Sequence, residues 1–339
     1  PCGSAVRTAR GAGDNAVRIF AAFQHFNWEA HNLAPALREL GDLTWYDWHA
    51  EDWYDQYHPQ WHILGKTSMN MELARRVQDA HQVAPLDVFY GYLCGRLIHR
   101  GYITYIREGL AIPTLNMTLD DKTHRYSALE PTGFAGMVDI ASAFDLCWTS
   151  DPTAVAWYEQ HGARAIYLPA GANPDVFVPR ECARDIGVLF VGKCYGRRAE
   201  IVQGLQQRGV DVQAYGQGWP NGPVSTEAMV DLMNRAIITL GIGETTDPAL
   251  LLLKGRDFEA PMCGAFYLAQ DNPELATHYD IGGEIVTWRD VPDLADKCRY
   301  YLAHPQEVEQ IRRAGAARAR AEHTWRRRFE DAFRALGVM

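Results

Sequence analysis

The sequence lacks the short motifs that mark several large enzyme classes. It contains no C-x-x-C pair, no H-E-x-x-H and no D-x-D, so nothing in it demands a catalytic metal. A G-x-x-x-x-G-K-[ST] string is also missing, which disfavours a P-loop nucleotidase. The first predicted strand-to-helix turn has no G-x-G-x-x-G, which disfavours dinucleotide binding of the usual NAD kind.

Long apolar runs and excess positive charge are also missing. The longest apolar run, around residues 248–253, is far shorter than the roughly 18–20 residues that cross a bilayer, so we expect no stable membrane span. The chain has 33 Lys and Arg against 42 Asp and Glu, a formal charge of −9, which argues against non-specific nucleic-acid binding. Its seven scattered cysteines predict a reducing, cytoplasmic location.

What is present is the composition of a globular protein of 339 residues, 47% apolar and 22% charged. One core rarely extends beyond about 250–300 residues, so the length predicts two domains. Residues 1–15 are rich in Gly, Ala and Ser without an apolar segment, and we interpret them as a disordered leader.

Short apolar runs alternate with segments of helical spacing along the chain, a pattern typical of βαβ units and parallel sheets. The expected strands are 17–23, 43–46, 86–90, 112–115, 144–149, 165–168, 185–191, 210–215, 236–240 and 265–269. The expected helices are 29–40, 69–81, 95–109, 153–161, 197–207, 225–234 and 250–263, followed by a helical stretch over 291–336 with breaks near 304–305 and Gly315. A Gly- and Pro-rich break at 169–174 separates two Rossmann-like halves, 16–170 and 171–310, with 311–339 expected to return to the first half.

A basic turn follows the first strand of the second half. Gly192, Lys193, Arg197 and Arg198 lie where this strand passes into a helix, and a helix N-terminus attracts anions. Glycine lets a ligand approach the backbone closely. The turn predicts a diphosphate site; the alternative is a solvated basic turn.

Two further loops follow predicted strands of the same half. In the first, Tyr215, Gly216 and Trp219 provide space and a ring surface for a planar base, although Trp219 is as easily explained by packing. In the second, Gly243 and Glu244 provide a carboxylate for sugar hydroxyls, or a cap for the next helix. Ligands of open α/β sheets bind beyond the carboxyl ends of the strands, so these loops are expected to form one site.

The most distinctive string extends from Lys254 through Arg256 and Glu259 to Cys263-Gly264. It resembles the donor-binding helix of GT-B glycosyltransferases, and more narrowly that of the spore-maturation CgeB-like enzymes. Other strings share the resemblance: Gly192-Lys193, Tyr215-Gly216-x-Gly218-Trp219, Leu302-Ala303-His304-Pro305 and Ala321-Glu322-His323-Thr324-Trp325-x-x-Arg328. The similarity covers roughly residues 115–330. From the residues alone, Lys254 and Arg256 are as well explained by ion pairs on a helix surface.

The resemblance implies that Glu259 is the second Glu of the family's E-x7-E motif and binds the nucleotide ribose. The first Glu falls at Leu251, a departure from the pattern, and Glu244 is the candidate to replace it. Lys193, Arg197 or Arg256 then holds the diphosphate and stabilises charge on the leaving group, which makes a metal or other cofactor unnecessary.

The first half offers fewer signals. His25 ends the first strand and is a candidate to orient an acceptor hydroxyl, although a lone His is more often structural. Asp121, or its neighbour Asp120, is a candidate acceptor base, with helix capping as the alternative. Residues 45–61 are unusually aromatic and suit ring stacking, packing or an oligomer contact.

Taken together, the resemblance implies an α/β protein of GT-B architecture that transfers a hexosyl unit from a nucleoside diphosphate sugar, with UDP favoured, to an acceptor hydroxyl. Retention of configuration is implied by the same likeness. Two alternatives stay open: a nucleotide-sugar-binding protein without catalysis, and a sugar-nucleotide epimerase of the same fold. The acceptor is open among polysaccharide, protein, small molecule and modified nucleic acid, and the sequence does not indicate the oligomeric state.

Overall fold

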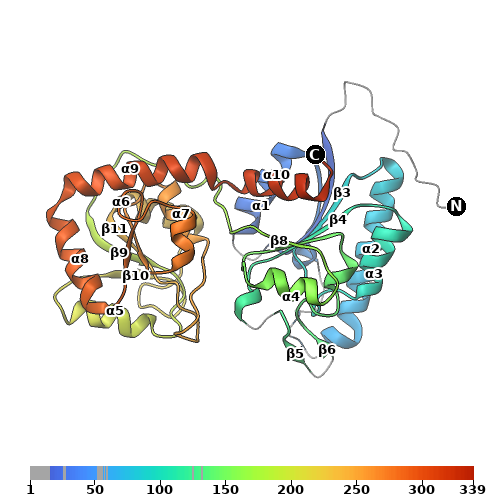
Figure 1. The fold of residues 1–339 in the computed structure, drawn as a ribbon, viewed down its shortest axis with the longest axis horizontal. Coiled ribbons are helices and arrows are strands. Elements are labelled where there is room, and N and C mark those ends of the chain that lie inside the picture. The colour runs from blue at the N-terminus through green and yellow to red at the C-terminus, as the bar shows by residue number, and fades with distance from the viewer. Residues whose placement is uncertain are drawn as a thin grey trace.

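The chain forms two lobes side by side, each built around one parallel sheet (Figure 1). The computed structural model describes residues 16–339 except 26–27, 52–55, 57, 59, 124–125 and 131–132. The interpretation of 1–15 as a leader therefore lies outside the described residues, as does part of the aromatic segment 45–61.

The first lobe contains a six-stranded sheet in the order β2-β1-β3-β4-β7-β8. Its strands are β1 (Val17–Ala22), β2 (Gly41–Tyr46), β3 (Val88–Gly91), β4 (Thr114–Thr118), β7 (Leu146–Thr149) and β8 (Ala165–Tyr167), and β5 (Leu129–Glu130) and β6 (Gly133–Phe134) form a separate hairpin. Its helices are α1 (Glu29–Leu40), α2 (Lys66–Val83), α3 (Arg100–Thr104) and α4 (Ala154–Gln160), with single turns η1 (Trp48–Ala50), η2 (Trp61–Gly65), η3 (Tyr105–Gly109), η4 (Asp121–Thr123) and η5 (Ala141–Ala143).

The second lobe contains a five-stranded sheet in the order β10-β9-β11-β12-β13. Its strands are β9 (Ile186–Val191), β10 (Gln213–Tyr215), β11 (Ala236–Gly241), β12 (Tyr267–Gln270) and β13 (Val286–Trp288). Its helices are α5 (Arg198–Gln206), α6 (Thr226–Arg235), α7 (Arg256–Met262), α8 (Val291–Ala303) and α9 (Pro305–Glu322), with a single turn η6 (Pro273–Thr277). Strand β1 and strand β9 are buried almost throughout, which explains their unbroken apolar runs.

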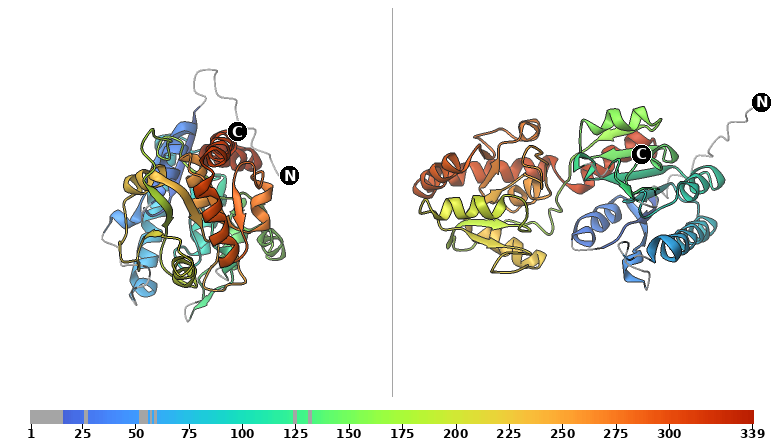
Figure 2. Two further views of the ribbon diagram at one scale, coloured as in Figure 1. Left: turned by 90° about the vertical axis from the view of Figure 1, so that its left-hand side faces the viewer. Right: turned by 90° about the horizontal axis from the view of Figure 1, so that it is seen from below.

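The C-terminal helix α10 (Trp325–Leu336) crosses to the first lobe, where it packs on α1 and β7 (Figures 1 and 2). Its buried aromatic stripe, Trp325, Phe329 and Phe333, recurs every four residues and therefore faces one side of the helix. Helix α9 packs on α7 and α8 of the second lobe. The crossing therefore lies at His323-Thr324, where Thr324 caps α10, and not at residue 311 as the sequence suggested.

Three other expectations from the sequence were wrong in detail. The helix expected from 250 begins at Arg256, because Leu251 pairs with Glu244 in an antiparallel bridge. Residues 95–99 are not helical, since the N–H of Gly95 donates to the carbonyl of Gly136. Helix α9 continues through Gly315 without a break, and strands β5, β6 and β13 were not predicted.

Side chains and backbone join the lobes at several points. Ala172 pairs with Thr324 in a parallel bridge, so the two connecting segments lie side by side. Asn173 is bound to α1, through Nδ2 to the carbonyl of His31 and through its N–H to Asn32 Oδ1. Such contacts fix how the two sheet edges face one another.

Both sheets have the same topology. In each, the first strand lies between the second and the third, so the strand order reverses beside β1 in one lobe and beside β9 in the other. Open α/β sheets bind their ligands beyond the carboxyl ends of the strands at such a switch point. Each lobe is therefore expected to present a binding site at this edge.

Candidate functional site

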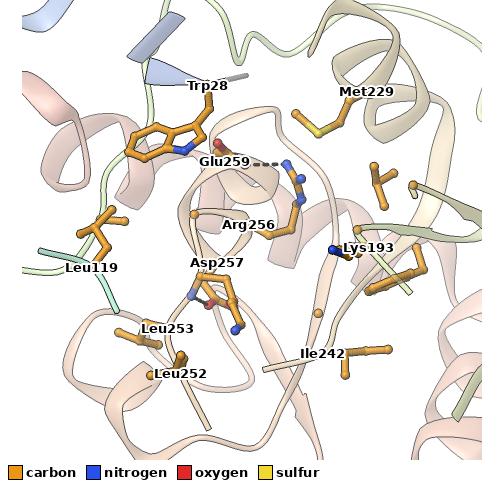
Figure 3. Close-up of a pocket in the computed structure, with 18 of the residues that line it drawn as sticks. Trp28, Leu119, Lys193, Met229, Ile242, Leu252, Leu253, Arg256, Asp257 and Glu259 are labelled. Carbon is orange, nitrogen blue, oxygen red and sulfur yellow. Dashed lines mark hydrogen bonds and ion pairs between the residues drawn. The ribbon is translucent and has the colours of Figure 1, made fainter. Parts of the chain in front are cut away.

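A cleft of about 840 Å³ lies between the lobes at the switch point of the second sheet (Figure 3). Its second-lobe wall comes from the ends of β9 and β11, the loop after β10 and the start of α7. Trp28, Tyr92, Leu119 and Asp120 of the first lobe face it, and Trp325 of α10 completes the lining. Seven of the predicted donor-site residues line this cleft: Gly192, Lys193, Arg198, Gly216, Lys254, Arg256 and Glu259.

Arg198 is the buried cation of the cleft. Only 6% of the residue is exposed, and its guanidinium donates to the carbonyls of Lys193 (2.9 Å) and Ile242 (2.9 Å). Its guanidinium also lies 4.0 Å from the ring centre of Tyr195. Burial lowers the pKa of Arg198, and within the described part of the chain it has no carboxylate partner. A buried positive charge without an anion is costly, so an anionic ligand would stabilise it.

Two lysines add to this charge. Lys193 is exposed after β9, and its ammonium has no partner in the described part of the chain. Lys254 donates from Nζ to the hydroxyl of Tyr195 (3.2 Å). The cleft thus holds three cations that form no ion pair with a described carboxylate.

A buried hydrogen-bond network positions the segment that carries Lys254. Asp257 Oδ2 accepts from the N–H of Lys254 (2.6 Å), and Oδ1 accepts from the Tyr267 hydroxyl (2.7 Å). A Cβ at Gly241 would lie 2.1 Å from that hydroxyl, so only glycine leaves room for Tyr267 at the end of β11. Burial raises the pKa of Asp257 to about 6.

Glu259 and Arg256 form an ion pair on α7, three residues apart (Figure 3). Glu259 is 7% exposed; burial raises its pKa, and Arg256 opposes that effect. The Arg256 Nε is buried and has no partner in the residues that the structure describes. Both Arg256 and Glu259 line the cleft, where a bound ligand would contact them.

Glu244, the candidate to replace the missing first Glu, lies outside the cleft lining. Glu244 pairs with Leu251 through the backbone, yet its carboxylate is buried and bound by Arg197 through Nε (3.0 Å) and Nη2 and by Gln270 (2.7 Å). Burial acts to raise the pKa of Glu244, but these hydrogen bonds outweigh it and the pKa is lowered. Arg197, Gly243 and Glu244 are not part of the cleft lining, and Leu252 and Leu253 occupy this wall instead.

In the loop after β10, the predicted residues mainly contact other parts of the protein. Trp219 donates from Nε1 to the carbonyl of Gly192 (2.8 Å) and packs edge-on against Phe190. Gly216 has a φ of +132°, and a Cβ there would lie 2.3 Å from the Gly192 carbonyl oxygen. Tyr215 donates to Gln213 (3.2 Å). Of the three predicted residues, only Gly216 lines the cleft.

The two catalytic candidates of the first lobe also lie outside the cleft lining. His25 Nδ1 accepts from the N–H of Ala30 (3.3 Å) at the start of α1 and lies 3.7 Å from Glu29. Asp121 is 3% exposed and accepts hydrogen bonds from Thr118 (2.5 Å) and Tyr158 (3.0 Å). Burial raises the pKa of Asp121. Its neighbour Asp120 is the one that reaches the cleft.

Sequence reasoning missed several residues of the cleft. Asp257 stands inside the string that pointed to Glu259, and an acidic residue two positions before it was the available signal. Trp28 and Trp325 stack with ring centres 5.5 Å apart across the junction of α1 and α10, a tertiary contact that no local pattern predicts. Among the described residues, no group of three or more His, Cys, Asp or Glu is placed to hold a metal ion. No helix in that same part of the chain is long and apolar enough to cross a membrane.

Comparison with known proteins gives one family match in the second half of the chain. Residues 197–334 match the protein family described as "Glycosyl transferase-like". No curated protein sequence matches the chain.

Solved structures share the fold at low identity. Sucrose-phosphate synthase from Thermosynechococcus elongatus superposes with a TM-score of 0.66 at 12% identity, over 95% of this chain and 99% of that one. HepE from Anabaena in complex with UDP-glucose gives 0.64 at 12% identity, over 95% and 100%. A putative UDP-N-acetylglucosamine 2-epimerase from Listeria monocytogenes gives 0.54 at 11% identity, over 90% and 94%. The chain therefore has the two-domain, Rossmann-like GT-B fold, and its residues 197–334 are similar to the glycosyltransferase-like family.

Proposed function

We propose that the chain is a glycosyltransferase that moves a hexosyl unit from a nucleoside diphosphate sugar, with UDP favoured, to an acceptor hydroxyl. The observation that carries the proposal is the group of three cations, Lys193, Arg198 and Lys254, at the switch point of the second sheet, none of which forms an ion pair with a described carboxylate. The match of residues 197–334 to a glycosyltransferase-like family and the UDP-glucose bound to HepE support it.

In this proposal the diphosphate binds to Lys193, Arg198 and Lys254, while Glu259 binds the ribose. Charge that develops on the leaving diphosphate as the glycosidic bond breaks is then stabilised by cations that are already in place. The donor bond breaks between the anomeric carbon and the phosphate oxygen, and the acceptor oxygen forms the new bond. The proton of the acceptor hydroxyl passes to a phosphate oxygen, so neither a metal nor another cofactor is required.

Retention of configuration is part of the proposal. A phosphate oxygen that takes the acceptor proton lies on the face that the leaving group departs from, so attack on that face preserves the anomeric configuration. NMR of the new anomeric centre tests this step, and an inverted product would contradict it. The narrower likeness to CgeB-like enzymes and a cytoplasmic location are also proposals.

The direct test of the donor site is nucleotide binding. UDP, GDP and ADP are compared by thermal shift, because a ligand that binds the folded state stabilises it in proportion to ln(1 + [L]/Kd). UDP is expected to give the largest shift, and Lys193→Ala and Glu259→Ala should both weaken it. Unchanged affinity in both variants would mean that the donor site is misplaced.

An epimerase is the second candidate, because epimerases appear among the structural neighbours. An epimerase changes the donor sugar without an acceptor, whereas a transferase releases UDP and forms a new glycoside. Incubation of UDP-hexoses with the protein alone, followed by NMR of the sugar, separates these outcomes. Tight nucleotide binding with neither product would support a binding protein without catalysis.

A further inference from the structure

A second cavity, of about 560 Å³, lies in the first lobe. It is placed at the switch point of the first sheet, because its walls include residues that lie one or two positions beyond the ends of β1, β2, β3 and β4. We define it as the first-lobe pocket by its lining: Gln24, Glu29, Trp48, Gln56, Tyr92, Leu93, Cys94, Arg96, Leu97, Thr118, Leu119, Asp120, Asp121, Ala128, Ala135, Gly136 and Met137. Tyr92, Leu119 and Asp120 line both this pocket and the cleft between the lobes, so the two cavities adjoin.

The wall formed by residues 93–97 is held in place by side chains behind it. Lys66 Nζ donates to the carbonyl of Gly95 (2.6 Å), and Asn70 Nδ2 donates to that of Leu97 (2.8 Å). Asn116 accepts from the N–H of Leu93 (3.1 Å) and donates to its carbonyl (3.0 Å).

The same segment is held on its other side. Trp61 donates to the carbonyl of Arg96 (2.9 Å), and backbone hydrogen bonds join 95–96 to 135–136. A wall with this many fixed backbone groups is already formed before a ligand binds, as is usual for small-molecule sites.

The body of the pocket is apolar. Trp48, Leu93, Leu97, Ala135 and Met137 are each between 1% and 7% exposed. The buried Nε1 of Trp48 has no partner in the described part of the chain. Pockets of roughly 300–1,000 Å³ with mostly apolar walls and a few polar groups enclose most of a drug-sized molecule.

The ionisable groups of the pocket are mainly acidic. Glu29, Asp120 and Asp121 line it, while its one arginine, Arg96, is paired with Glu130. The carboxylates in the lining outnumber its arginine, so a negatively charged ligand would be repelled. The pocket is also walled by several segments of the first lobe, which suits a small molecule better than a chain passing through.

From this geometry we infer that the acceptor is a small molecule with an apolar ring body and one hydroxyl, and without negative charge. Its body occupies the first-lobe pocket, and its hydroxyl reaches the cleft beside Asp120. This inference rests on the proposed function and names its acceptor class.

The test uses 2-naphthol and its saturated analogue 2-decalol as uncharged probes. Matched probes are 6-hydroxy-2-naphthoate, which adds a carboxylate, and maltotriose, which represents an oligosaccharide. Binding of the naphthyl probes is followed by their fluorescence anisotropy without donor, and transfer is followed with the UDP-hexose that binds best.

We expect 2-naphthol to bind and to be glycosylated, and the carboxylate probe to bind at least about tenfold more weakly. Ala135→Trp fills the pocket and should lower both 2-naphthol affinity and kcat/KM by at least about tenfold. If the UDP affinity of this variant lies within about twofold of that of the parent protein, the variant is folded. If Ala135→Trp does not fold, the smaller Ala135→Leu replaces it. Met71→Trp, on the exposed face of α2, is the matched control and should change neither value.

Three results would overturn the inference: no binding or transfer of either uncharged probe, equal binding by Ala135→Trp, or preferred transfer to maltotriose. Loss of the proposed function shows differently, since then UDP itself fails to bind, whatever 2-naphthol does.

Discussion

The two sheets of this chain share one topology, but their switch points carry opposite chemistry. Beyond β9 and β11 the cleft is lined by Lys193, Arg198 and Lys254, which form no ion pair with a described carboxylate. At the corresponding edge of the first lobe, the pocket has an apolar body and three carboxylates in its lining, Glu29, Asp120 and Asp121. The difference teaches that topology fixes where a ligand binds, whereas the side chains at the strand ends fix what kind of ligand it is.

The largest expected effect concerns His323, which lies between α9 of the second lobe and α10 on the first lobe. His323 is 3% exposed; its Nδ1 accepts from Arg328 (2.9 Å) and its Nε2 lies 3.0 Å from the carbonyl of His278. Burial and the nearby Arg328 lower the pKa of His323 to about 4. Because this folded-state pKa lies below the unfolded value of about 6.5, the unfolded chain takes up the proton first, and about 3 kcal/mol of stability is lost as pH falls from 7 to 4.

Urea unfolding at pH 7 and pH 4 measures this loss. His323→Gln should reduce the pH dependence, because it removes one titrating ring, while the neighbouring His278, whose pKa burial also lowers to about 4, keeps its own contribution. His304→Gln at an exposed position serves as the control. An identical pH dependence in His323→Gln would contradict the assignment of this residue.

The next effect tests the charged side of the comparison. Arg198→Met removes the buried cation and keeps an apolar side chain of similar length. Hydrogen bonds to charged groups contribute about 1.5–3 kcal/mol, so UDP affinity is expected to fall about tenfold to a hundredfold by titration calorimetry. Folding stability should change little, because removal of an unpaired buried charge offsets the loss of the hydrogen bonds to the carbonyls of Lys193 and Ile242. Arg208→Met, just beyond the end of α5, is the control. A stable Arg198→Met variant with unchanged UDP affinity would show that the buried cation does not bind the nucleotide.

A smaller effect is expected from the network below the cations. Asp257→Asn keeps the shape but can accept only at one atom, so either the Lys254 N–H or the Tyr267 hydroxyl loses its partner. One such loss corresponds to about 1 kcal/mol, or roughly a fivefold reduction in UDP affinity. Tyr267→Phe should give a similar reduction by calorimetry. If both variants bind UDP as the parent does, the network does not position the site.

The smallest effect on nucleotide affinity is expected at Arg197. This residue is bound to Glu244 and lies outside the cleft lining, so Arg197→Met should change UDP affinity less than about twofold. The same change leaves Glu244 without its cation and should lower the free energy of unfolding by about 1–3 kcal/mol. A large loss of UDP affinity with unchanged stability would instead restore Arg197 to the donor site that the sequence suggested.

The sequence predicted the fold better than the site. Alternating apolar runs and helical spacing were sufficient to locate nearly every strand, and α1 was predicted with its observed bounds. Local spacing failed where distant contacts decide the structure: Leu251 pairs with Glu244 instead of extending α7, and the N–H of Gly95 is bound by the carbonyl of Gly136.

Position directly after a strand indicated which segments line the cleft, whereas residue type did not indicate which side chains face it. Lys193 and Arg198 follow β9 and line the cleft, but Arg197, between them, turns to Glu244. Which of two adjacent arginines faces a cavity depends on the carboxylate that another loop supplies, and one sequence does not show that partner. The first-lobe pocket went unpredicted for the same reason, since its wall is fixed by Lys66 and Asn116 from other elements.

The most direct test of the central claim is calorimetric titration of UDP into the parent protein, Lys193→Ala and Glu259→Ala. The account predicts saturable binding of one UDP per chain and a loss of about tenfold or more in each variant, because each removes a charged contact at the cleft. Binding of UDP with the same affinity in all three proteins would contradict it.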